Sequence, residues 1–337
     1  MKILSIETSC DETAVAVTEN GTRVLSNAIA SQIAKHAETG GVVPEVAARE
    51  HIKAMIPTLR AAMREAGVTW KDIDAIAVTR EPGLIGSLVV GRITAVALAF
   101  ACGKPLIEVN HIHGHIYANW LETETEFPIL TLTVSGGHNE LVLMRGHGQM
   151  EIIAETVDDS AGEAFDKVAR LLGLPYPGGP AIEARAALGN AGAFKFPIGM
   201  KKDKNFSFSG LKTSVFYLLK DNERLLKDGG KDGEKFVNDV AASFQSAAVS
   251  ALLEKLIRAV KKYAVKEVHL SGGVSANKYL RAQTEKALAS LRLDQAPVLR
   301  WPKKLSYCTD NAAMIGSAGY FMRANLSFIN HFPKHLS

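Results

Sequence analysis

Two histidines at helical spacing point most directly to chemistry in this 337-residue chain. His111 and His115 follow an apolar run, Leu106 to Val109, that predicts a buried strand leading into a short helix. Residues four apart lie on one face of a helix, so both imidazoles can reach one transition metal. Hydrogen-bonded histidines without a metal are the alternative, and this segment alone leaves both open. A zinc-protease helix is excluded, because Ile112 stands where that motif needs a general-base Glu.

Asp310 is the candidate for a third metal ligand. It stands beside Thr309, which we expect to cap the last substantial helix, 309–322. A carboxylate at a helix start also complements the helix dipole without any metal. As a ligand it would complete a His-His-carboxylate set with positions open for substrate oxygens.

Composition limits the class of protein. A hydrophobic content of 47% over 337 residues allows a large core and suggests two lobes. We find no signal-peptide pattern, and the longest apolar stretch, Ile93 to Cys102, is too short to span a bilayer. The three cysteines (Cys10, Cys102 and Cys308) lack C-x-x-C spacing, so we expect a cytoplasmic protein without disulfides.

The charge is mildly basic, with a formal net charge of +4. Lysines cluster at Lys201-Lys202-Asp203-Lys204, Lys261-Lys262 and Lys303-Lys304. These clusters can contact phosphates, although solvated lysine faces are more common. The charge therefore permits a nucleic-acid partner without requiring one.

One order of elements, strand, polar turn, strand, turn, strand, occurs twice. The first copy contains Glu19-Asn20-Gly21, and Asn-Gly between apolar runs strongly predicts a hairpin. The duplication predicts two related lobes whose turns present backbone N–H groups towards a shared cleft. The expected strands are 3–6, 14–17 and 23–28 in the first copy, and 129–134, 141–144 and 150–154 in the second.

Elsewhere the pattern alternates between helix and strand, which indicates an α/β class with helix-covered sheets. Residues 175–180 predict a rigid turn, and 199–209 and 227–235 predict surface excursions. The glycine-bearing turns at Ser135-Gly136-Gly137-His138 and Ser271 to Asn277 suit the close approach of an anion. The main expected helices are 45–66, 86–101, 160–172, 236–263 and 309–322, and the further strands are 75–79, 106–109, 267–270 and 298–301.

The ordered motifs resemble one family from Met1 to about Gly319, the tRNA N6-adenosine threonylcarbamoyltransferases (TsaD), once labelled O-sialoglycoprotein endopeptidases. The matching segments are Glu7 to Thr13, His36 to Glu45, Pro82-Gly83-Leu84, His111 with His115, Ser135 to His138, Ala161 to Lys167, Tyr176 to Pro180, Phe206 to Lys212, Gly272 to Asn277 and Cys308 to Asn311.

The resemblance implies an actin-like (ASKHA) two-lobed α/β fold with duplicated sheet-plus-helix halves and a central cleft. Residues 1–109, joined by the C-terminal helix 310–324, would form the N-terminal lobe, and residues 110–309 the C-terminal lobe with the adenylate-binding turns. The implied reaction transfers a threonylcarbamoyl group from threonylcarbamoyl-AMP to N6 of the adenosine 3′ of the anticodon, in tRNAs that read A-starting codons.

The resemblance also assigns residues and partners. His111, His115 and Asp310 would hold one divalent ion, Fe²⁺ or Zn²⁺. As a mechanistic hypothesis that goes beyond the resemblance, Asp11 or Glu12 would accept the amine proton. The expected partners are tRNA, an inactive TsaB-like paralogue that dimerises with the N-terminal lobe, and a small TsaE-like ATPase, with no membrane. The adenylate contacts would be Thr133, Val134, Ser135, Gly136, Gly137, Asp166, Gly179, Glu183 and Asn277.

Three other functions compete with this expectation. A metallopeptidase needs a base that Ile112 does not provide. A small-molecule kinase or ATPase of the same fold would consume ATP and ignore tRNA. A non-catalytic scaffold would tolerate loss of His111.

Overall fold

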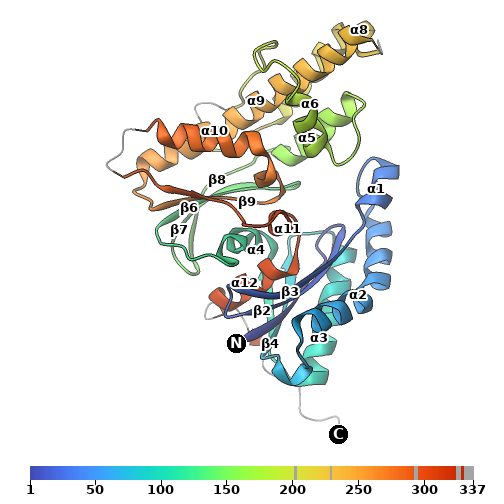
Figure 1. Cartoon of the computed structure of the whole chain (residues 1–337), viewed down its shortest axis with the longest axis vertical. Helices are drawn as coiled ribbons and strands as arrows, with labels where there is room; N and C mark the ends of the chain where they lie inside the picture. The colour runs from blue at the N-terminus through green and yellow to red at the C-terminus, as the bar shows by residue number, and fades with distance from the viewer. Residues whose placement is uncertain (201–202, 228–229, 292–294, 324–327, 330–337) are drawn as a thin grey trace. The chain divides into compact units, whose positions relative to one another are not determined.

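The computed structural model describes residues 1–337 except 201–202, 228–229, 292–294, 324–327 and 330–337 (Figure 1). The contacts divide the chain into two compact units. Unit 1 comprises Met1–Thr125, Gly146–Gln149 and Trp301–Ser337, and unit 2 comprises Glu126–Arg145 and Met150–Arg300. This division differs from the boundary expected after residue 109, because residues 110–125 belong to unit 1.

Unit 1 contains a six-stranded mixed sheet in the order β11-β5-β4-β1-β2-β3. The first three strands form the expected antiparallel hairpins, while β4 and β5 run parallel to β1. Asn20 and Gly21 both have positive φ in the three-residue turn between β2 and β3, a conformation that Asn and Gly adopt readily. The strands are β1 Lys2–Glu7, β2 Glu12–Glu19, β3 Arg23–Ser31, β4 Ala75–Glu81, β5 Leu106–Asn110 and β11 Phe328–Ile329.

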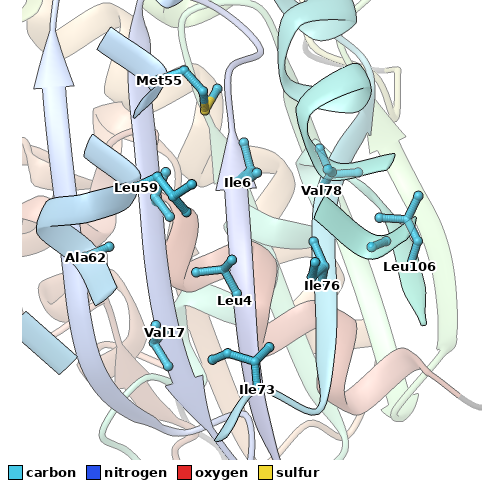
Figure 2. Close-up of a cluster of buried hydrophobic side chains, with 13 residues drawn as sticks. Leu4, Ile6, Val17, Met55, Leu59, Ala62, Ile73, Ile76, Val78 and Leu106 are labelled. Carbon is cyan, nitrogen blue, oxygen red and sulfur yellow. The ribbon is translucent and has the colours of Figure 1, made fainter. Parts of the chain in front are cut away.

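Helices pack against this sheet, and apolar side chains of its strands form the contact. Figure 2 shows side chains from β1, β4 and α2 meeting in one buried cluster that includes Leu4, Ile6 and Leu59. Burying each large apolar side chain contributes about 1.5–3 kcal/mol. The helices are α1 Ile33–Thr39, α2 Pro44–Ala66, α3 Ile85–Cys102, α4 His111–Tyr117, α11 Leu305–Cys308 and α12 Ala312–Met322, with 3-10 turns η1 Trp70–Asp72 and η2 Ala118–Trp120.

Unit 2 repeats the plan with a five-stranded sheet in the order β10-β9-β6-β7-β8. β6 pairs antiparallel with β7 and parallel with β9, so the predicted duplication is confirmed. Its strands are β6 Ile129–Val134, β7 Asn139–Gly146, β8 Gln149–Glu155, β9 Glu267–Ser271 and β10 Val298–Arg300. Its helices are α5 Ala161–Leu171, α6 Gly178–Ala186, α7 Ser209–Asp221, α8 Glu223–Lys227, α9 Lys231–Lys262 and α10 Lys278–Ala289, with the 3-10 turn η3 Gly273–Ala276.

Several element boundaries differ from the expectations. The turn expected over 175–180 ends early, because Gly178 already begins α6. α9 begins at Lys231 rather than at residue 236, inside the expected excursion. α12 begins at Ala312, and its cap is Asn311, whose Oδ1 accepts the N–H of Met314 at 3.0 Å; Thr309 is therefore not the cap. Residues 201–202, 228–229 and 324 of the expected segments lie outside the described residues.

Among the described residues, two helices are long and apolar enough to cross a membrane by length and composition alone, α3 and α9. The most apolar 18 residues of α9 are 72% buried, as in the core helix of a globular unit, whereas α3 is only 28% buried. α3 is thus longer than the apolar stretch from Ile93 to Cys102 that the sequence pattern emphasised, and much of the surface of α3 is exposed.

Glu267 joins three segments of unit 2. Its buried carboxylate accepts hydrogen bonds from His269 Nε2 at 2.7 Å, from the Arg300 guanidinium at 2.8 and 2.9 Å, and from the Glu126 N–H at 3.1 Å. Burial opposes the charge, but His269 and Arg300 hold the pKa of Glu267 at about 2 instead of the ordinary 4.5. The folded state therefore stabilises the ionised form.

Glu267→Gln should lower the free energy of unfolding at pH 7 by about 3 kcal/mol. Since the folded pKa is depressed, the native stabilisation is present above pH 4.5 and lost as the pH falls towards 2. In urea titrations at a series of pH values, the free energy of unfolding of the variant should lack this dependence on pH. Glu223→Gln, which removes an exposed pair with Lys227, is the control and should change stability by less than about 1 kcal/mol. Equal effects of both substitutions would contradict the assignment.

Candidate metal centre and substrate-binding turns

α4 places the two histidines of the metal motif in unit 1. The helix begins directly after β5, and the Asn110 side chain caps it by accepting the N–H groups of Ile112 at 2.9 Å and His113 at 3.2 Å. His111 and His115 then share one face, with ring centroids 4.6 Å apart. Both residues are buried. The sequence prediction of a histidine pair on a short helix is therefore confirmed.

Close packing of α4 against α12 brings Asp310 to the histidines. A Cβ atom at Gly114 would lie 2.7 Å from Ile315 Cδ1, so a larger residue there would displace that side chain of α12. Asn311 fixes the segment before α12, because its amide donates to the Thr309 carbonyl at 2.8 Å while its oxygen caps the helix. Asp310 is thus held between α11 and α12.

The three side chains have the spacing of a metal-ligand set. Oδ1 of Asp310 lies 3.1 Å from Nε2 of His115 and 3.5 Å from Nε2 of His111. Ligands about 2.1 Å from one ion lie roughly 3.0–3.4 Å apart. Nδ1 of His115 makes no hydrogen bond to the described residues, and Nε2 faces the Asp310 carboxylate. A buried imidazole with one unsatisfied nitrogen, aimed at a carboxylate, fits a site built for a cation.

Glu7, at the end of β1, orients the first histidine. Its Oε2 lies 3.1 Å from Nδ1 of His111, and Ser9 Oγ lies at the same distance from that nitrogen. The carboxylate also accepts the Ser9 N–H and the Thr79 hydroxyl. Because a carboxylate only accepts, we assign the proton to Nδ1, which leaves the Nε2 lone pair facing Asp310. Histidine ligands are commonly oriented by such an outer carboxylate.

Without a cation the cluster holds a proton in its place. Burial disfavours charge on His111, yet Asp310 and Glu7 raise its pKa to about 9. Burial works against the carboxylates too, but His111 lowers the pKa of both, and together with His115 it brings that of Asp310 to about 2. A cation binding here would displace that proton, since a ligand nitrogen must be deprotonated.

Asp11 and Glu12, the predicted proton acceptors, lie in unit 1 at the turn into β2 and are largely buried. Oε1 of Glu12 accepts the Ser31 hydroxyl at 3.1 Å. Burial first, then the charges of Asp310 and Asp11, raise the pKa of Glu12 to about 10. In the cation-free cluster these effects favour the protonated form of Glu12. The roles of both residues stay predictions.

The predicted substrate-binding segment in unit 2 begins with the last two residues of β6, Thr133 and Val134, and continues into the turn before β7 with Ser135, Gly136 and Gly137. Two glycines let other backbone approach it: a Cβ atom at Gly272, where φ is +80°, would lie 2.4 Å from the Val134 carbonyl, and one at Gly162 would lie 2.5 Å from the Ser135 carbonyl. Cβ positions built on Gly136 and Gly137 meet no described atom within 4 Å. The start of α5 and the β9–η3 turn thus surround an open glycine turn.

The other predicted adenylate contacts also lie in unit 2, but they form hydrogen bonds within the protein. Asp166 accepts the Gly178 N–H at 2.7 Å, beside Gly179, and Glu183 accepts the Lys278 N–H at 2.6 Å. The Asn277 amide donates to Gln245 of α9 at 2.8 Å. Glu183, Gln245 and Lys278 line a pocket of about 570 Å³ with Tyr279, Pro180 and several alanines.

The sequence pattern missed some of the residues that shape these sites. Glu7 and Ser9 fall inside a quoted motif but received no role, and their contact with His111 spans about a hundred positions. Gln245 has no signal of its own, because it is one polar residue on the buried side of a long helix. The buried position of Glu7 at the end of an apolar strand is the one clue that could have been used.

The fold defines the chain as a member of the actin-like (ASKHA) class. The Acidaminococcus fermentans (R)-2-hydroxyglutaryl-CoA dehydratase component A aligns over 96% of this chain and 99% of its own, with a TM-score of 0.56 and 13% identity. HypF from T. kodakarensis aligns over 96% of this chain and 48% of its own, with a TM-score of 0.60 and 16% identity. At these identities the similarity shows the fold alone.

The sequence itself shows the family. The TsaD family profile, tRNA N6-adenosine threonylcarbamoyltransferase, matches residues 23–317. The proteins of that name from Bacillus subtilis and Halalkalibacterium halodurans are 50% and 51% identical, over 95% and 94% of this chain and 90% and 89% of theirs. The chain belongs to the TsaD family, as the sequence motifs predicted.

Glu7→Gln should weaken the binding of Zn²⁺ to the purified chain by about 10- to 100-fold, because the His111 ring loses its charged outer partner. Competition with a chromogenic chelator measures this affinity without any assay of activity. His113→Ala is the matched control, since His113 lies on the same helix and outside the ligand set, and it should bind as the native chain does. An unchanged affinity of the Glu7 variant, with the fold verified by thermal unfolding, would refute the role of Glu7.

Proposed function

We propose that this chain transfers the threonylcarbamoyl group of threonylcarbamoyl-AMP to N6 of the adenosine 3′ of the anticodon, in tRNAs that read A-starting codons. The observation that carries the proposal is about 50% identity over nearly the full length of relatives with that activity in their names. The His-His-Asp cluster supports it. A metallopeptidase is disfavoured by Ile112, and fold similarity at 13–16% identity transfers no activity to this chain.

The reaction is an acyl transfer to an amine. N6 of adenosine attacks the carbamoyl carbon, the bond from that carbon to the phosphate oxygen breaks, and AMP leaves while the amine loses a proton. The mixed anhydride is already activated, so the protein mainly supplies orientation and charge stabilisation. Asp11 or Glu12 would accept the proton, and the raised pKa of Glu12 favours Asp11 for this role.

The adenylate would be held by unit 2. Backbone N–H groups of the open turn at Gly136 and Gly137 suit the phosphate, because a glycine turn allows close approach. The alanine-rich pocket beside Tyr279 suits a nucleobase. The residues proposed to contact the adenylate are Thr133, Val134, Ser135, Gly136, Gly137, Asp166, Gly179, Glu183 and Asn277.

His111, His115 and Asp310 would hold one divalent ion in unit 1, either Fe²⁺ or Zn²⁺. When bound, such an ion supplies Lewis-acid stabilisation of negative charge on substrate oxygens. The chain's own contribution is to fix the three donors: Glu7 orients one ring, Asn311 holds the carboxylate segment, and Gly114 permits the close helix packing.

The exposed apolar surface of unit 1 fits the proposed paralogue partner. Ile85, Val89, Ile93, Val96 and Phe100 recur at helical spacing on α3, and each is exposed by 38% or more. Such a stripe marks a protein interface when a polar rim surrounds it. We propose that the TsaB-like paralogue covers this stripe, and that the TsaE-like ATPase and tRNA join the assembly in the cytoplasm.

The native chain, given its helper proteins, unmodified tRNA and fresh threonylcarbamoyl-AMP, should form N6-threonylcarbamoyladenosine, detected by mass spectrometry of the nucleosides. His111→Ala should reduce the product by at least about 100-fold, whereas His113→Ala should leave it unchanged. Asp11→Asn should slow a single turnover with saturating adenylate more than Glu12→Gln does. No product from the native chain, with helpers that support a known family member, would reject the proposal.

Ile93→Asp should weaken binding of the TsaB-like paralogue by about 30-fold or more, since a buried charge at an interface centre costs at least about 2 kcal/mol. Leu188→Asp is the control, because Leu188 is 73% exposed but lies on unit 2. Isothermal titration calorimetry gives both affinities. Equal affinities of the two variants for the paralogue would show that α3 does not belong to the interface.

A further inference from the structure

A second pocket of unit 2 lies outside the substrate-binding turns. It has a volume of about 310 Å³ and is formed by β8, the C-terminal part of α9 and Lys204. None of the residues proposed to bind the adenylate or the metal lines it. The lining residues are Leu141, Glu151, Ile152, Ile153, Ala154, Lys204, Lys255, Arg258, Ala259, Lys262 and Tyr263.

The charge of this pocket is strongly positive. Four cationic side chains line it (Lys204, Lys255, Arg258 and Lys262), against the single carboxylate of Glu151, so the lining carries 4 − 1 = +3. Two residues outside the lining pair with it, Arg145 with Glu151 at 2.8 Å and Glu254 with Arg258 at 3.1 Å, and their opposite charges leave the excess unchanged. An anion in this pocket would therefore meet little repulsion.

The cations of α9 position the loop that carries Lys204. The ammonium group of Lys255, only 3% exposed, donates to the Met200 carbonyl, and Arg258 donates to the Asp203 carbonyl at 3.0 Å. Lys204 follows directly and is exposed, as is Lys262 on α9. Lys204 and Lys262, about sixty positions apart in sequence, thus line one pocket. Lysines that were only solvated surface residues would not need to lie around one pocket.

We propose that this pocket binds the sugar-phosphate backbone of the tRNA substrate, away from the reacting adenosine; the inference rests on the proposed function. Several cations around one concave surface suit phosphodiester groups, which dominate protein–RNA affinity. Arg258 follows Gln245, which lines the proposed nucleobase pocket, by thirteen residues of α9. At 1.5 Å per residue this is about 20 Å, so the RNA backbone would lie well apart from the pocket proposed for the adenylate.

The test is a double charge reversal, Lys204→Glu with Lys262→Glu, in the full chain together with its helper proteins. The dissociation constant for unmodified tRNA should rise at least tenfold near 0.1 M salt, and the slope of log K against log salt should fall by about two. The turnover rate at saturating tRNA should stay unchanged, because neither lysine belongs to the proposed reaction site.

Lys220→Glu with Lys286→Glu is the matched control. Both lysines are exposed on helices of unit 2 and outside this pocket, and the change in net charge is the same. The control should bind tRNA within about twofold of the native chain. Equal weakening in both doubles would reduce the effect to net charge and overturn the proposal.

Two further outcomes are informative. Native tRNA affinity in the pocket variant, with loss of a helper protein instead, would assign the pocket to an acidic protein surface and overturn the proposal. If no variant, the native chain included, formed modified nucleoside, the proposed function would fail. A selective loss of tRNA binding in the pocket variant would then still support the RNA site, so the two failures are distinguishable.

Discussion

The Glu7 carboxylate is fully buried, and the centre of unit 1 depends on how its charge is satisfied. An unpaired buried carboxylate would cost several kcal/mol. Here it receives His111, the Ser9 N–H and the Thr79 hydroxyl, which come from α4, the turn after β1 and β4. One charge therefore ties together the strand, the turn with Asp11 and Glu12, and the helix with the histidines.

The same region shows why small residues are needed near charged ones. Asp310 precedes α12, which packs tightly on α4 at Gly114. In unit 2, Gly162 and Gly272 allow two segments to close around the β6–β7 turn in the same way. In both units, the polar groups of the candidate sites lie next to glycines, which have no side chain. Backbone at such places approaches a ligand without steric conflict.

Much of the fold could be predicted from local patterns. Alternating apolar residues and the Asn20-Gly21 turn predicted the hairpins, and the spacing of His111 and His115 predicted their shared helix face. Contacts distant in sequence carried no such signal: nothing local connects Asn277 with Gln245 or His111 with Glu7. The helix cap was misassigned because Thr309 and Asn311 are both good cap residues, and tertiary packing decides between them. α6 was missed because Pro177-Gly178-Gly179-Pro180 reads locally as a turn.

α9 is more than a core helix, because a neighbouring segment follows it in register. Four residues of α9 form hydrogen bonds with this segment, and the order along the helix is the same as the order along the segment. The pairs are Asp239 with Asn190, Ser243 with Phe194, Lys255 with Met200 and Arg258 with Asp203. Adding one residue within α9 would rotate everything beyond it by about 100° and advance it by about 1.5 Å. All later bonds would then miss their partners. Substitutions on the exposed face of this helix are tolerable, but its length is fixed, and insertions in this family should occur in the loops instead.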